Sequence, residues 1–354
     1  MFNVFHLQGV DALHDGEYQH AKTCLLQAIA ENPETPESYF FLGKACFLCD
    51  EKDEAILYLK QYIELRKDNA EEIGNISYAF DLLGQSYEAI NKDDDAIVCY
   101  QAATKIHPSC ASAWHNMGLL YIKSAQHYLE QEKLEVSRDL FNTAKFFIKK
   151  ALEISGDNPM FLNSVASWYE TYIELLEKLM EDQEAVHKNI ANNFQWAIQY
   201  YQQALTRCDE KDVTLKNIIT SNLTECFAQY GHFLYKNQNY VAAQAFYLET
   251  LQLTPSHLSA ITQMGMCLFQ QDDYVEARKY FLKIFDETDD QQEIADAWLN
   301  IACTYRLEKD WDNARDALDK AKRLAPEDPC IDEEEQKLTD SIDESSLMAA
   351  PRHG

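Results

Sequence analysis

Apolar residues recur at spacings of three and four along most of the chain, with small residues set among them. Residues 113–121 and 297–305 share one order: Trp, an apolar residue three places on, a small residue next, and Tyr three places further. These spacings put the residues on one face of a helix, and the small residue lets a second helix approach closely. The two sets are Trp114, Met117, Gly118 and Tyr121, and Trp298, Ile301, Ala302 and Tyr305.

A second pattern follows the first and also recurs. Residues 240–247 begin Tyr-Val-Ala-Ala, and residues 274–281 begin Tyr-Val-Glu-Ala, so the two segments start 34 residues apart. The chain has only 10 glycines and 8 prolines, a composition that favours helices over strands. Two helical patterns that alternate at a fixed interval predict an array of helix pairs rather than one globular core.

The pattern resembles the tetratricopeptide repeat (TPR) family, whose unit of about 34 residues is a helix–turn–helix. That family places large residues at the fourth, seventh and eleventh positions and small ones at the eighth, twentieth and twenty-seventh. The third repeat of this chain is nearly complete. Its matching residues are Phe80, Leu83, Gly84, Tyr87, Ala96, Tyr100, Ala103 and Pro108.

The resemblance covers residues 2–326 and implies an all-α fold, a TPR-type α-solenoid in which antiparallel helix pairs form a right-handed superhelix. We place eight repeats near residues 2–35, 36–69, 77–110, 111–158, 159–207, 224–257, 258–291 and 295–328. The short segments 67–74 and 208–215 are expected to act as spacers. The fourth and fifth repeats carry extra helix-like residues, so these two central repeats are predicted to have elongated helices.

The tail is acidic. Residues 327–344 are predicted to form an acidic capping helix, because a solenoid needs a polar end, and residues 345–354 are predicted to be disordered.

Net charge is −28, which disfavours nucleic acid and favours a basic or neutral protein or peptide as the partner. No long apolar run predicts a membrane span, and no secretory signal is recognised at Met1, so we expect a cytoplasmic protein. Ten cysteines fit free thiols in a reducing compartment. Cys46 and Cys49 lack further ligands at metal-binding spacing, so no metal site is expected.

Catalytic motifs were sought and none was recognised. The histidines are scattered, no metalloprotease, P-loop or dinucleotide-binding motif occurs, and paired acids such as Asp289 and Asp290 fall at turns between helices. We therefore expect no catalytic residues, no cofactor and no enzymatic activity.

In the TPR family the first helix of each repeat lines the concave groove, through its second, fifth, sixth, ninth and twelfth positions. The resemblance implies these groove candidates here: Phe40, Lys44, Phe47, His115, Asn116, Leu119, Gln229, His232, Gln263, Met266, Asn300 and Arg306. Asparagine and glutamine donate and accept at once, which suits an extended peptide backbone. The competing interpretation is that some of these side chains only pack against the next repeat.

The function that the sequence favours is a non-catalytic scaffold or adaptor that binds a peptide or protein segment in the concave groove. The alternative is a dedicated cytoplasmic chaperone for bacterial secretion or assembly substrates, although those TPR proteins usually have fewer repeats. The two-carboxylate clamp of some TPR proteins is poorly matched, because Asp81 and Glu88 occupy groove positions in the third repeat. The partner, the oligomeric state, and the choice between the groove and the elongated helices as binding surface stay open.

Overall fold

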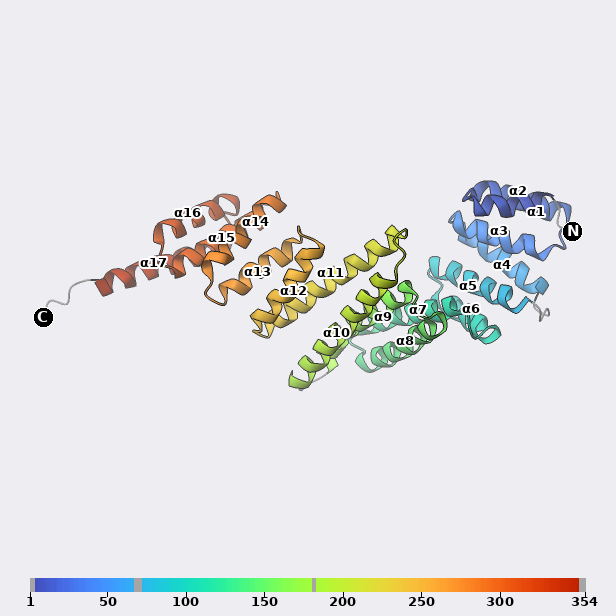
Figure 1. Ribbon diagram of the computed structural model, residues 1–354, viewed down its shortest axis with the longest axis horizontal. Coiled ribbons are helices and arrows are strands. Elements are labelled where there is room, and N and C mark those ends of the chain that lie inside the picture. Colours follow the sequence, from blue (N-terminus) through green and yellow to red (C-terminus); the bar gives the residue numbers. More distant parts are fainter. Residues whose placement is uncertain (1–3, 67–71, 180–182, 350–354) are drawn as a thin grey trace. The chain divides into compact units, whose positions relative to one another are not determined.

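A computed structural model describes residues 4–66, 72–179 and 183–349 of the chain. Within these residues it consists of seventeen helices and contains no strand (Figure 1). The all-α fold of helix pairs that the repeat pattern predicts is confirmed. The described helices include none that is both long and apolar enough to cross a membrane.

The chain divides into two compact units, residues 1–216 and 217–354, which we call the N-terminal and C-terminal units. The first repeats of the N-terminal unit are built from α1 (Val4–His14), α2 (Tyr18–Glu31), α3 (Pro36–Leu48), α4 (Lys52–Arg66), α5 (Ile73–Ala89) and α6 (Asp93–Ile106). The longer helices α7 (Ala111–Glu130), α8 (Leu134–Ser155), α9 (Pro159–Leu179) and α10 (Gln183–Arg207) follow.

The helix α11 (Val213–Lys236) begins in the N-terminal unit and lies mostly in the C-terminal unit. The C-terminal unit continues with α12 (Tyr240–Leu253), α13 (Leu258–Phe269), α14 (Tyr274–Glu287), α15 (Gln291–Leu307), α16 (Trp311–Leu324) and α17 (Pro329–Ala349).

Helices pack in sequence order within each unit. In the N-terminal unit the first helix of each pair also contacts the first helix of the next pair, from α1 to α3 and onward to α9. The glycine at the eighth repeat position permits the tight contact inside a pair. A Cβ at Gly118 of α7 would lie 2.6 Å from Ile148 Cγ1 on α8, and one at Gly265 of α13 would lie 2.5 Å from Phe281 Cε1 on α14.

The turn from the first helix to the second is alike in both units. A residue in the left-handed region ends the first helix, for example Asp50 (φ 65°) and Lys309 (φ 63°). The next N–H then bonds the carbonyl five residues back, as Glu51 does with Cys46 and Asp310 with Tyr305, both at 2.9 Å. This is the Schellman closure of a helix end, and its recurrence marks the repeat register.

Three boundaries differ from the sequence prediction. α11 begins at Val213, well before residue 224, because Ile219 and Leu223 continue its buried stripe, so the elongated helices extend into the sixth repeat. α5 begins at Ile73, which makes the last part of the predicted 67–74 spacer helical, while residues 67–71 lie outside the described residues.

The third difference concerns the tail. α17 continues to Ala349, so residues 345–349 are helical where disorder was predicted, and residues 350–354 lie outside the described residues. Ile331 and Leu338, seven residues apart, are buried against the core of the last repeat, and Ile342 packs beside them. This stripe continues the helix past the predicted end at residue 344.

Candidate functional site

The fifth repeat position, which was predicted to face a ligand, is buried in the N-terminal unit. Its residues on α1, α3, α5 and α7 are His6, Phe40, Asp81 and His115, and each is 9% exposed or less. Each contacts the following first helix. His6 Nδ1 lies 2.9 Å from Ser38 Oγ, and the Phe40 ring lies 5.8 Å from that of Tyr78. Phe40 is therefore a packing residue and not a groove residue.

His115 is also withdrawn from any ligand. Its Nε2 lies 2.7 Å from Ser164 Oγ on α9, and its ring stacks on Phe161 at a centroid distance of 4.5 Å. Burial lowers the pKa of His115 to about 4, so the imidazole is neutral near pH 7. The prediction of His115 as a binding residue is wrong, because the close approach of α7 and α9 encloses it.

Asn116 is held by its neighbours in the same way. Its Nδ2 donates to Asp81 Oδ1 at 3.1 Å, and Gln85 Nε2 donates to Asp81 Oδ2 at 3.2 Å. Burial raises the pKa of Asp81, while these donors partly offset the rise. Asn116 therefore links α7 to α5 with one of its amide N–H groups, and its predicted role in peptide binding stays a prediction.

The remaining candidates of the N-terminal unit differ in their surroundings. Phe47 packs against the core, and Lys52 Nζ lies 3.8 Å from its ring centroid, so that face of the ring is covered. Lys44 is half-buried and has no ion-pair partner among the described residues. Leu119 is exposed at 37%. Only Lys44 and Leu119 keep a surface position that fits the prediction.

The C-terminal unit places its candidates differently. Gln229 and His232 on α11 are exposed, and Gln263 and Met266 on α13 are half-buried, as is Asn300 on α15. Gln263 Oε1 is fully shielded from solvent and has no hydrogen-bond partner in the described part of the chain. A buried amide oxygen without a donor is costly, and a bound segment could reach this atom only if the Gln263 side chain turned toward solvent.

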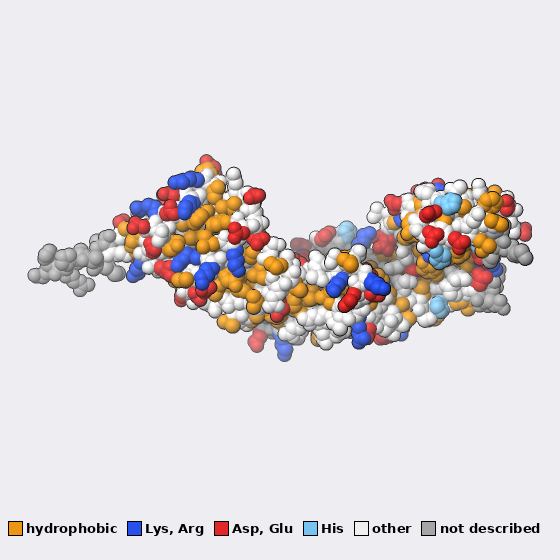
Figure 2. Space-filling view, turned by 45° about the horizontal axis from the view of Figure 1, so that its top comes forward, with side chains coloured by type: hydrophobic (Ala, Val, Ile, Leu, Met, Phe, Trp, Pro, Cys, Tyr) orange, Lys and Arg blue, Asp and Glu red, His pale blue; other side chains and the backbone are white. Residues whose placement is uncertain are grey.

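Two more such polar atoms, Gln244 Nε2 and Tyr247 Oη, lie on α12, which packs against α13. In the view of Figure 2, Lys and Arg side chains lie around an apolar area on the C-terminal unit.

Arg306 is not available to a ligand. Its Nε donates to Glu334 Oε1 on α17 at 2.5 Å, and its Nη2 lies 3.4 Å from Glu334 Oε2. Glu334 is only 3% exposed, so the two charges form a buried pair that fastens α17 to α15. The prediction that Arg306 lines an open groove is wrong, because the acidic cap occupies this face of the last repeat.

One acidic cluster has donor atoms close enough to suggest a metal site. Cys46 Sγ and carboxylate oxygens of Glu51 and Glu54 lie within 4.8 Å of one another. Lys22 forms ion pairs with both carboxylates, at 2.7 Å for Glu54. Burial raises the pKa of the Cys46 thiol to about 12. A protonated thiol beside an ammonium group is a poor ligand set for a cation, so these residues form an ion-pair network.

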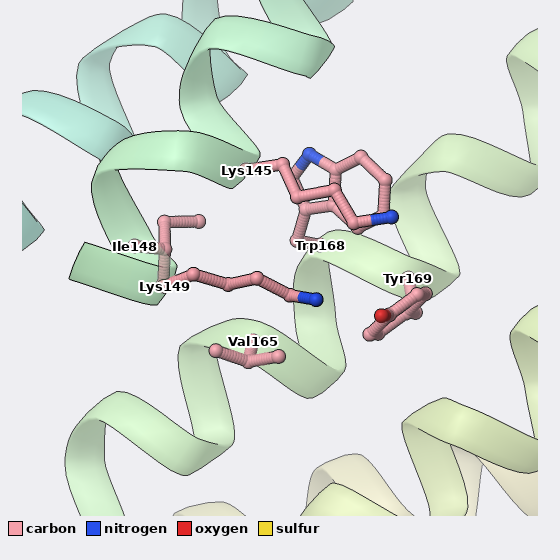
Figure 3. Close-up of a pocket in the computed structure, with 6 residues that line it drawn as sticks. All are labelled: Lys145, Ile148, Lys149, Val165, Trp168 and Tyr169. Carbon is pink, nitrogen blue, oxygen red and sulfur yellow. The ribbon is translucent and has the colours of Figure 1, made fainter. Parts of the chain in front are cut away.

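The sequence analysis missed a basic and aromatic crevice between α8 and α9 (Figure 3). Its lining residues are Lys145, Ile148, Lys149, Val165, Trp168 and Tyr169. A signal was available: Lys145, Lys149 and Lys150 lie close together on one helix of a strongly acidic chain. Such a local concentration of positive charge in an acidic protein indicates a specific contact.

Comparison with known proteins gives two family matches. The tetratricopeptide repeat model matches residues 256–327, and the FAT domain model matches residues 12–213, which correspond to the helix pairs of the N-terminal unit. The crystal structure of YrrB, described as a TPR protein with an unusual peptide-binding site, is 19% identical with a TM-score of 0.42; it covers 67% of this chain and 97% of that one.

Two curated relatives are similar in sequence. Anaphase-promoting complex subunit 3 of Schizosaccharomyces pombe is 21% identical over 41% of this chain, and the match spans 18% of that protein. Photosystem I assembly protein Ycf3 of Cyanophora paradoxa is 27% identical over 23% of this chain and 47% of its own length. The chain thus spans less than half of each relative. The tetratricopeptide repeat model matches residues 256–327, which agrees with the repeated helix pairs of a tetratricopeptide repeat protein. The FAT domain model covers more than half of the chain, so the chain belongs to the FAT domain family.

Proposed function

We propose that this protein is a scaffold that holds an extended, neutral or basic segment of a partner protein on the first-helix face of its C-terminal unit. Tetratricopeptide repeat proteins bind other proteins and are typically non-catalytic. The observation that carries the proposal is the buried, unpartnered Oε1 of Gln263 on α13. If the half-buried Gln263 side chain turns outward on binding, a peptide N–H would satisfy this atom and remove the cost of leaving an acceptor buried and unbonded.

Residues at the same repeat position on the neighbouring first helices also favour peptide binding on this face. Gln229 on α11 and Asn300 on α15 stand at the same repeat position as Gln263. Gln229 Nε2 donates to Glu225 Oε1 at 3.0 Å, and the Asn300 side chain has no hydrogen-bond partner in the described residues. The amide groups of such a row can donate to and accept from successive peptide units. The chain's net charge of −28 favours a partner segment that is not acidic on this face. The ten free thiols favour a reducing compartment such as the cytoplasm.

The test is a selection of random peptides displayed on phage, carried out on the full chain. Selected peptides should bind wild type and lose roughly tenfold or more in affinity with Gln263→Ala/Asn300→Ala, because two amide contacts are removed. The control pair, Gln202→Ala/Gln252→Ala, changes two exposed amides and should bind as wild type does. Peptides that bind all three proteins equally would exclude this face as the binding site.

A second candidate is an assembly chaperone, which the sequence similarity to photosystem I assembly protein Ycf3 favours. A chaperone holds its client only until the client's own complex forms. Size-exclusion chromatography of the purified partner complexes separates the two proposals: a scaffold stays in the finished complex, and a chaperone is absent from it.

A further inference from the structure

The crevice between α8 and α9 lies in the N-terminal unit and shares no residue with the proposed peptide face. It is a shallow surface depression, and its base is formed by Val165 and Trp168 of α9 and Ile148 of α8. Figure 3 shows the two lysine side chains of α8 running in the same direction along the crevice, with their ammonium groups toward Tyr169. A depression this shallow suits contact with the surface of a partner protein rather than an enclosed small molecule.

Neither lysine has a carboxylate partner among the described residues. Lys145 Nζ lies over aromatic rings instead, 4.2 Å from the centroid of Trp168 and 4.9 Å from that of Tyr169. Other basic residues of α8 are paired: Lys150 Nζ lies 3.1 Å from Glu153, and Arg138 pairs with Glu135. Within α8, the two lysines of the crevice are thus the basic residues without a counter-charge among the described residues.

The two positive charges are unfavourable where they stand. Burial lowers the pKa of Lys145, and the nearby charge of Lys149 lowers it further. The chain has 59 acidic residues and could have supplied a partner, as it does for Lys22 and Arg306. A bound anion would neutralise the pair and remove this cost.

The aromatic residues around the lysines form a fixed platform. Trp168 Nε1 donates to the carbonyl of Phe141 at 2.9 Å, which holds the ring in place. The Tyr169 ring stacks on Tyr200 of α10 at 5.8 Å and lies 5.2 Å from Trp196. Trp196 is 45% exposed, although tryptophan is usually well covered in a monomeric fold. A partly exposed ring next to a basic pair is typical of the anchor region of a protein interface.

We propose that Lys145 and Lys149 bind side-chain carboxylates of an acidic segment of a partner protein, and that an apolar residue of that segment packs on Trp196. The elongated helices of the fourth and fifth repeats then carry a binding surface of their own. Its preference is opposite in charge to that of the peptide face in the C-terminal unit. The inference does not depend on that face, because no residue is shared between the two.

The test uses the full chain and a short fluorescent peptide in which glutamates flank two leucines. Both ends of the peptide are blocked, so only side chains carry carboxylates. Binding is measured by fluorescence anisotropy. Lys145→Gln/Lys149→Gln should weaken the affinity by roughly tenfold or more, because two charge-assisted contacts are lost. Lys105→Gln/Lys211→Gln removes the same charge from exposed sites of the N-terminal unit and should change the affinity by less than about twofold.

Further variants separate binding from folding. Lys149→Gln alone, at a half-buried position, should fold as wild type does by circular dichroism and still weaken binding, and Lys149→Arg should retain it because the charge is kept. Carbodiimide treatment of the complex should join the peptide's glutamates to Lys145 or Lys149, as identified by mass spectrometry. The groove variant Gln263→Ala/Asn300→Ala should bind the acidic peptide normally, so failure of one proposal leaves the other intact.

The proposal is overturned if the glutamate peptide does not bind wild type, or if the crevice and control variants weaken it equally. A third arm replaces the glutamates with phosphoserines, and a fourth adds inorganic phosphate as competitor. Binding of the phosphoserine peptide alone would also contradict the assignment of a carboxylate partner.

Discussion

The two units differ in what surrounds the polar residues on the first helix of each repeat. In the N-terminal unit, polar residues on the first helices bond to the next first helix: His115 to Ser164, and Asn116 to Asp81. In the C-terminal unit, the sixth-position residues Gln263 and Asn300 have no such partner in the described residues. The same repeat position thus forms a hydrogen bond between repeats in one unit and has no such bond in the other.

The difference has a physical origin. A polar group on a first helix can form a hydrogen bond to the first helix of a neighbouring repeat only if that helix carries a suitable partner. α9 carries Ser164 and α5 carries Asp81. Where the facing residues are apolar or small, the polar group has no hydrogen-bond partner across the contact between repeats. The repeat pattern alone therefore places a residue on a face without telling whether that face is occupied.

The largest predicted effect concerns the one buried charge pair of the C-terminal unit described above. Arg306→Met should destabilise the protein by ~3–5 kcal/mol, because Glu334 would stay buried without its cation. Hydrogen exchange should show early opening of α17. Arg306→Met/Glu334→Met should recover most of the loss, since an apolar pair removes both charges. A single variant as stable as wild type would mean that α17 is not fastened by this pair.

The second prediction concerns the contact between α7 and α9 in the N-terminal unit, and it is tested by measuring the free energy of unfolding as a function of pH. The pKa of His115 is lowered from 6.5 to about 4, so between these values the unfolded chain binds a proton that the folded chain excludes. The free energy of unfolding should therefore fall as pH drops through this window, by up to ~3 kcal/mol from this group.

The measurement is the unfolding free energy at several pH values for wild type and His115→Gln. The variant should show a shallower decline with acid over this window. His14→Gln, which changes an exposed histidine of α1, should follow wild type. Parallel curves for wild type and His115→Gln would show that His115 is protonated equally in both states.

The smallest predicted effect tests a feature that both units share, the close contact between the two helices of a pair at a glycine. Gly118→Leu in the N-terminal unit and Gly265→Leu in the C-terminal unit should each cost ~1–3 kcal/mol or more, because the new side chain meets Ile148 or Phe281. Hydrogen exchange should show the loss mainly in the unit that carries the change. Gly74→Leu is the control, since a Cβ there meets nothing within 4 Å. A harmless Gly118→Leu would contradict the helix-pair register.

The sequence predicted the fold well because the repeat encodes contacts inside a pair. Gly118, Ala144 and Ile148 meet as the register requires, since these residues are close in sequence and recur. Boundaries were predicted less well. α11 starts early because Ile219 and Leu223 extend its buried face outside the repeat consensus.

The candidate site was predicted only in part, because each failure depends on a residue from a different repeat. His115 is enclosed by Ser164 and Phe161 of α9, and Arg306 is taken by Glu334 of α17. Contacts between residues so far apart in the sequence do not appear as a repeating pattern in the sequence. The crevice was missed for the same reason: Lys145 has meaning only beside Trp168, which comes from the next helix pair.

The acidic helix α17 has a consequence for self-association. A repeat array whose last apolar face stays open can add another copy of itself at that end, and repeated addition would give a filament. Here Ile331 and Leu338 cover that face, while the opposite side of α17 presents exposed acids such as Glu333, Asp340 and Asp343. Two copies that approached each other through this face of α17 would meet like charges, which disfavours their association there, most strongly at low ionic strength.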